Sequence, residues 1–200
     1  MNHPTIFLDT PIFFTCAEDT KSRTALQHAK NAGHSILTSI SVLGEAFIQM
    51  HEHEKALDYI TALNQLLDEW KVTVLFPNDS VRILCFKMGE EELDTRMIRE
   101  PTDRTHLAYA MAYHSDYFLT SDRNLIRYRI PSSLEEIGFS KPTCLPLEEF
   151  RNDMFMKVRD VSYAWDHRYI LESQRCEVNH PDECPEFMQS LKPRPSGRGS

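Results

Sequence analysis

The stretch PTDRTHLAYAMAYHSDYFLTSDRNLIR, residues 101–127, decides the fold, because it predicts a helix, a short buried strand and the start of another helix. Thr102 is placed to cap the first helix, whose small and apolar residues suit packing on a sheet. The run 117–120 is rich in β-prone residues. Asp103 is therefore expected at the start of a helix, and Asp122 just after the carboxyl end of a strand.

Two further acids occupy comparable places upstream. Asp9 ends the apolar run 6–9, which is typical of a central strand covered on both faces. Glu45 lies near the start of a helix that Ser39 or Ser41 is expected to cap. Because ligands of open α/β sheets bind at the carboxyl ends of the strands, the four acids are expected to converge there. Converging carboxylates are typical ligands of a hard cation.

Strands alternate with helices along the chain, which predicts a single α/β domain with a short, mostly parallel sheet and helices on both faces. The expected strands are 6–9, 35–38, 72–76, 117–120 and 143–145. We expect one helical turn over 12–15 and helices over 17–31, 39–53, 54–71 and 81–88. Gly89 and the glutamates after it interrupt the apolar pattern, and the glutamates are interpreted as a solvated surface. The prolines around 143–145 suit an edge strand.

Four short motifs, taken in order, resemble the PIN-domain nucleases and in particular the VapC-like toxins. They are FLDT (7–10), SVLGE (41–45), DRTHLAYA (103–110) and LTSD (119–122). The resemblance covers about residues 4–150 and implies a PIN-like three-layer fold. The chain departs from the family pattern at Pro11, and the run after Asp122 is unusually basic.

The resemblance implies a metal-dependent endoribonuclease that hydrolyses phosphodiester bonds of single-stranded RNA, as the toxin of a toxin–antitoxin pair does. One or two Mg²⁺ or Mn²⁺ ions can activate the attacking water and stabilise charge on the phosphoryl oxygens. We assign Asp9 and Asp103 as the principal metal ligands. Asp122 and Glu45 complete the catalytic site directly or through water, or orient the attacking water. The alternative for Glu45 is a partly exposed acid with no ligand role.

Residues beside these acids are candidates for substrate binding. Thr10, Thr120 and Ser121 can bind an acid of the site or a phosphate of the RNA. Arg104 and Arg123 lie next to the acids in sequence and can contact RNA, or are solvated surface arginines.

Two further polar residues of this region are interpreted as structural. Asp116 precedes the strand over 117–120, so it is expected at the opposite end of the sheet from the other acids. His106 is interpreted as a packing residue of its helix, and a catalytic role is the less favoured alternative.

Composition argues against several other classes of protein. The 200 residues carry a net charge of −8, which argues against a broad basic surface for nucleic acid but is compatible with a nuclease that binds cations. No apolar run reaches the roughly 20 residues of a membrane span, and residues 1–10 lack a secretory signal, so we expect a cytoplasmic protein. The five scattered cysteines form no disulfide framework, and no P-loop or Rossmann glycine pattern is present.

The composition changes near residue 153. We expect a PIN-like nuclease domain over 1–152, a helical extension over 153–184 and a disordered tail over 185–200. The aromatic and apolar residues of 153–174 predict a helix that docks on the domain or on a second subunit. Cys176, His180 and Cys184 match no zinc motif, so structural zinc is not favoured there.

Partners follow from the resemblance alone. VapC-like proteins form homodimers and are bound by an antitoxin, so both are expected here. A function of a different class is also open: a PIN-like module that binds nucleic acid or protein, with catalytically weak or inactive acids. The net acidity and Pro11 favour that alternative.

Overall fold

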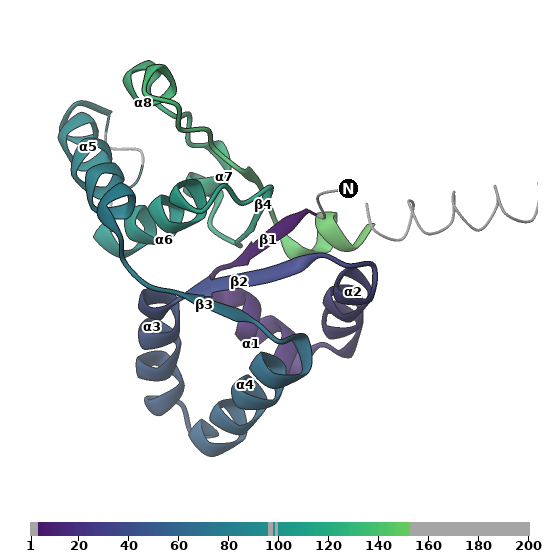
Figure 1. Cartoon of the computed structure of the whole chain (residues 1–200). Helices are drawn as coiled ribbons and strands as arrows, with labels where there is room; N and C mark the ends of the chain where they lie inside the picture. Colours follow the sequence, from purple (N-terminus) through teal and green to yellow (C-terminus); the bar gives the residue numbers. More distant parts are fainter. Residues whose placement is uncertain (1–3, 96–97, 99, 153–200) are drawn as a thin grey trace, which may run out of the picture. The chain divides into compact units, whose positions relative to one another are not determined.

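The structure, a computed structural model, describes residues 4–95, 98 and 100–152 (Figure 1). Its centre is a five-stranded sheet in the order β3-β2-β1-β4-β5, and every neighbouring pair of strands is parallel. The strands are β1 (Thr5–Leu8), β2 (Ser35–Ser39), β3 (Thr73–Leu75), β4 (Tyr117–Leu119) and β5 (Thr143–Leu145). The predicted strands, their parallel pairing and the edge position of the last one are confirmed.

Helices pack on the sheet in two groups. The helices are α1 (Thr10–Glu18), α2 (Thr20–Asn31), α3 (Ile40–His51), α4 (Ala56–Trp70), α5 (Asp79–Thr95), α6 (Pro101–Ala112), α7 (Arg123–Arg127) and α8 (Ser132–Glu136). Helices α1 to α4 contact one another, and α5 packs along α6. Figure 1 shows α1, α3 and α4 below β2 and β3 in this view, and α5 and α6 above these two strands. The layered α/β fold is therefore as predicted.

The central strand β1 carries the core. Ile6, Phe7 and Leu8 are fully buried, and the ring of Phe7 lies 5.4 Å from that of Phe118 on the neighbouring β4. Burying each such side chain contributes roughly 1.5–3 kcal/mol to the free energy of unfolding. Because β1 has a partner on both sides, the residue that follows it is held in the middle of the sheet edge.

The first helical segment is longer than predicted. In place of one turn over 12–15, α1 begins at Thr10, since Asp9 caps it by accepting a hydrogen bond from the Thr10 amide at 2.9 Å. Pro11 fits there, because proline lacks only an amide that the first turn leaves unpaired. Asp19 then ends α1 and caps α2, accepting from two amides of its first turn. The single helix predicted over 17–31 is therefore divided at Asp19 between α1 and α2.

Three details of the remaining helices differ from expectation. Thr102 is not a cap, because α6 begins at Pro101 after Glu100, without a side-chain capping bond. Helix α5 continues through Gly89 to Thr95, since one glycine costs only about 1 kcal/mol and α5 packs along α6. The short helix α8 was not predicted.

Other predictions have a limited test in the described part of the chain. Cys16, Cys85 and Cys144 are free thiols there, in line with the absence of a disulfide framework. No helix over residues 4–95, 98 and 100–152 combines the length and apolarity needed to cross a membrane. The predicted extension over 153–184, the tail over 185–200 and the zinc question at Cys176 and its neighbours lie outside the described residues.

Candidate active site

Asp9 is the centre of a buried polar network at the carboxyl end of β1. The residue is only 4% exposed. One oxygen, Oδ1, accepts from the Thr10 amide at 2.9 Å and lies 2.9 Å from Nδ1 of His106. The other, Oδ2, accepts from the hydroxyl of Thr120 at 2.6 Å. Three separate segments therefore hold one carboxylate, which balances the cost of burying it.

His106 takes part in the site, so its interpretation as a packing residue is incomplete. The ring is fully buried, and because a carboxylate only accepts, Nδ1 donates to Asp9. Its other nitrogen, Nε2, lies 3.7 Å from Oε2 of Glu45. The sequence holds one signal for this contact, the position of His106 three residues after Asp103, which places both on one face of α6.

Glu45 reaches the network from α3. Its Oε2 accepts from the hydroxyl of Thr10 at 2.5 Å, and its Oε1 accepts from the amide of Gln49 at 3.0 Å. The face of α3 that carries it is open to solvent, because Ile48, three residues further along the helix, is exposed. Glu45 is therefore partly exposed and is linked to Asp9 through Thr10, while its role as a metal ligand stays a prediction.

Asp103 and Asp122 form the second half of the site. The pKa of Asp103 is raised to about 7, first by desolvation, then by the negative charges of Asp122 and Asp9 and by a side-chain hydrogen bond with Asp122. The nearby His106 opposes this shift. The structure thus brings Asp9, Asp103 and Asp122 close enough to repel one another, as their sequence positions predict.

Hydroxyl groups connect the two halves. The Thr120 hydroxyl donates to Asp9, and its oxygen accepts from the amide of Asp122 at 3.1 Å. Asp122 caps α7 by accepting from the amide of Asn124 at 2.6 Å. Thr10 and Thr120 each bind an acid of the site, one of the two roles predicted for them. Ser121 is exposed, which leaves its predicted role untested.

The basic candidates differ in exposure. Arg123 is exposed at the first position of α7, directly after Asp122, whereas Arg104 is partly buried and lowers the pKa of Cys85, although burial dominates and raises it. Lys141 holds the end of this segment, donating to the carbonyl oxygens of Ile126 and Tyr128 at 2.9 and 2.6 Å. A role in RNA binding for either arginine stays a prediction.

Asp116 lies at the amino end of β4, away from the site, as predicted. Its Oδ2 accepts from the amide of Thr5 at 2.7 Å and from the Thr5 hydroxyl at 3.0 Å. These bonds join β4 to β1 at the end of the sheet opposite Asp9. The structural interpretation of Asp116 is confirmed.

The donor set suits a hard cation, although the ligands are not gathered around one point. Within residues 4–95, 98 and 100–152, no three His, Cys, Asp or Glu side chains form a group that could hold a metal ion as they stand. The donors are nonetheless all carboxylate oxygens, the ligands that Mg²⁺ and Mn²⁺ prefer. Burial raises the pKa of Asp103 most, and the negative charges of Asp122 and Asp9 raise it further; a bound cation would offset the repulsion between these charges. The residues therefore fit a divalent cation.

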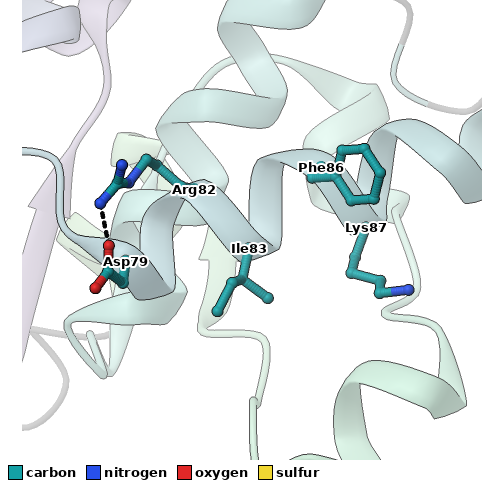
Figure 2. A pocket seen from close by; sticks show the side chains of 5 residues that line it. All are labelled: Asp79, Arg82, Ile83, Phe86 and Lys87. Atoms are coloured by element: carbon teal, nitrogen blue, oxygen red, sulfur yellow. Dashed lines mark hydrogen bonds and ion pairs between the residues drawn. The ribbon is translucent and has the colours of Figure 1, made fainter.

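A pocket elsewhere on the molecule does not involve these acids. It has a volume of about 560 Å³ and is lined by Asp79, Arg82, Ile83, Phe86 and Lys87 of α5 (Figure 2). Ile83 and Phe86 are about half exposed or more, and Arg82 forms an ion pair with Asp79. The chemistry of this surface is that of a solvated helix face.

Comparison with known proteins places the chain in a family. The PIN domain family model matches residues 6–131. VapBC2 from Rickettsia felis, bound to a DNA fragment from its promoter, is similar in structure with a TM-score of 0.55 and 13% identity, over 71% of this chain and 98% of the other. VapBC-1 from nontypeable Haemophilus influenzae gives a TM-score of 0.50 and 14% identity, over 72% and 98%. No curated protein sequence is significantly similar to the chain.

Proposed function

Because the chain belongs to the PIN-domain family, which implies a nuclease, we propose that it is a metal-dependent endoribonuclease that hydrolyses single-stranded RNA. One observation carries the proposal: acids from the ends of β1 and β4 and from the first turn of α6 lie together, where burial and the charges of Asp122 and Asp9 raise the pKa of Asp103 to about 7. Repulsion between carboxylates destabilises the folded protein, and a bound divalent cation would offset it.

Asp9 and Asp103 would be the principal ligands of Mg²⁺ or Mn²⁺, with Asp122 and Glu45 binding directly, through water, or by orienting the attacking water. A bound cation supplies a nucleophilic water and stabilises charge on the phosphoryl oxygens. Thr10 and Thr120 hold the acids of the site in place, since both donate to its carboxylates. The all-oxygen donor set supports these assignments.

RNA binding would rely on few basic residues, because the chain has a net charge of −8. Arg123 and Ser121 are exposed beside Asp122, and Arg104 follows Asp103 on α6. Cationic side chains next to the acids would bind the phosphates that flank the scissile bond. We expect their removal to weaken RNA binding more than the rate of cleavage of bound RNA.

The two similar VapBC structures support a role as the toxin of a toxin–antitoxin pair, with an antitoxin as partner. A homodimer and a cytoplasmic location are further parts of the proposal and rest on the resemblance to VapC-like toxins alone. Light scattering of the purified chain tests the dimer. Co-purification with a small protein encoded beside it tests the antitoxin, and loss of RNA cleavage in the complex is the expected result.

A PIN-like binding module that does not cleave RNA is the second candidate. It is favoured by the absence, among the described residues, of side chains already grouped to hold a metal ion. Calorimetric titration with Mn²⁺ separates the two functions. Binding at millimolar Mn²⁺ or below supports the nuclease, and no binding supports the module.

The direct test is cleavage of labelled single-stranded RNA with Mg²⁺ or Mn²⁺, compared with cleavage in EDTA and with a DNA strand of the same sequence. We expect metal-dependent cleavage of the RNA, reduced to background in Asp9→Asn and Asp103→Asn. Asp116→Asn is the matched control, since it removes an acid from the other end of β4 and should keep the wild-type rate. Equal cleavage in EDTA, or by the two site variants, would contradict the proposal.

A further inference from the structure

We propose that His106 is a positioning residue that holds the Asp9 carboxylate in the orientation required for metal binding, an inference that rests on the proposed metal-dependent nuclease. The imidazole is fully buried within α6, where an unpaired polar ring would be costly. Its Nδ1 lies 2.9 Å from Oδ1 of Asp9, a normal hydrogen-bond distance. The two residues are 97 apart in sequence, so this bond joins α6 to the end of β1.

The hydrogen bond matters because of what remains free on Asp9. A carboxylate offers about four lone-pair sites, and three donors use three of them: Thr10, His106 and Thr120. These donors come from the start of α1, from α6 and from the residue after β4. Together they fix the carboxylate plane and leave about one acceptor direction for a cation. Loss of one donor frees the carboxylate to rotate.

The same contact also sets the position of Asp103. His106 and Asp103 lie three residues apart on α6, hence on one face of the helix. Fixing His106 against Asp9 therefore places Asp103 beside Asp9 and Asp122, whose charges it experiences. If His106 served only for packing, it would not connect α6 to Asp9 through a hydrogen bond. A leucine of similar size would then replace it with no effect on metal binding.

The two ring nitrogens have different surroundings, which makes the inference testable. Nδ1 meets Asp9, whereas Nε2 has no hydrogen-bond partner in the part of the chain that the structure describes and lies 3.7 Å from Glu45. The amide nitrogen of asparagine occupies the place of Nδ1, and that of glutamine occupies the place of Nε2. His106→Asn therefore keeps the bond to Asp9, while His106→Gln and His106→Leu lose it.

The experiment measures the dissociation constant for Mn²⁺ by calorimetry in wild-type protein and the three variants. We expect His106→Leu and His106→Gln to bind Mn²⁺ about 10–100-fold more weakly, as when the hydrogen-bond partner of a metal ligand is removed, and His106→Asn to restore most of the affinity. In RNA cleavage the loss should fall on kcat with KM unchanged, because the buried ring cannot touch RNA. Tyr109→Phe on the same helix is the control and should bind Mn²⁺ as the wild type does.

A folded His106→Leu variant with wild-type Mn²⁺ affinity would overturn the inference. If that variant does not fold, equal affinities of the Asn and Gln variants would overturn it instead. Wild-type protein that binds Mn²⁺ without cleaving RNA contradicts the proposed function but leaves the role of His106 intact. Wild-type protein that binds no Mn²⁺ contradicts both.

Discussion

The end of β1 and the outer face of α5 carry charged side chains in opposite settings. Asp9 is 4% exposed and accepts hydrogen bonds from three segments. On α5, the ion pair of Arg82 with Asp79 joins side chains that are 74% and 82% exposed. Water can replace a partner lost on α5 but not one lost around Asp9. The buried carboxylate at the strand ends is therefore expected to affect stability and function strongly, whereas the exposed ion pair on α5 is expected to affect both little.

Removal of the Asp9 carboxylate should have the largest effect and is the strongest test of this contrast. Asp9→Ala leaves two buried donors, the Thr120 hydroxyl and Nδ1 of His106, without a partner, and it also uncaps α1. We expect a loss of about 2–4 kcal/mol in the free energy of unfolding, measured with urea. A loss below about 1 kcal/mol would show that water reaches this network, contrary to its burial.

Thr120→Val tests the link between the two halves of the site at nearly constant volume. It removes the donor to Asp9 and the acceptor for the Asp122 amide, both at a fully buried position. Unfolding in urea should show a loss of about 1–3 kcal/mol. Thr15→Val is the control, because its hydroxyl bonds only to the carbonyl of Pro11 at an exposed place on α1 and should matter little.

The raised pKa of Asp103 predicts a pH dependence in metal-free buffer. Its pKa rises from 3.8 in the unfolded chain to about 7 in the folded protein, so the folded state holds the proton more tightly. Stability from this group is therefore greatest below pH 4, falls between pH 4 and 7, and is lost above pH 7.

Asp103→Asn removes this dependence. Since solvent screens a partly buried side chain, we expect the variant to be more stable than the wild type by about 1–2 kcal/mol at pH 8 in EDTA, with little difference at pH 4. Thermal melts at the two pH values measure this. Added Mg²⁺ should reverse the order at pH 8, and an unchanged order would argue against a cation at this acid.

The smallest effects are expected on α5. Arg82→Ala breaks an exposed ion pair, and Phe86→Ala shortens a side chain that is 64% exposed. Each should change the free energy of unfolding by no more than about 0.5 kcal/mol and leave RNA cleavage unchanged. A larger loss of stability, or weaker cleavage, would show that this face has a partner of its own.

The difference between the two regions also separates what local sequence predicts from what it misses. On α5 the apolar pattern is interrupted at Gly89, yet the helix continues, because packing along α6 outweighs a small local preference. At the strand ends Asp9, Asp103 and Asp122 lie close together, because strand polarity and the alternation of strands with helices determine which residues share the sheet edge. Their role as a metal site stays a prediction. The local sequence pattern therefore predicts the position of a residue best where the order and direction of the strands already determine that position.

The sequence by itself determined the alternation of strands and helices, the parallel sheet, the positions of Asp9 and Asp122 just after strands and that of Asp103 in the first turn of a helix. Periodicity and capping report burial and helix ends, and these need only neighbouring residues. Only the tertiary structure decided that His106 bonds to Asp9 and that Thr10 bonds to Glu45, over separations of 97 and 35 residues. Such contacts depend on how far each helix slides and turns against the sheet, which is set by the packing of the whole core.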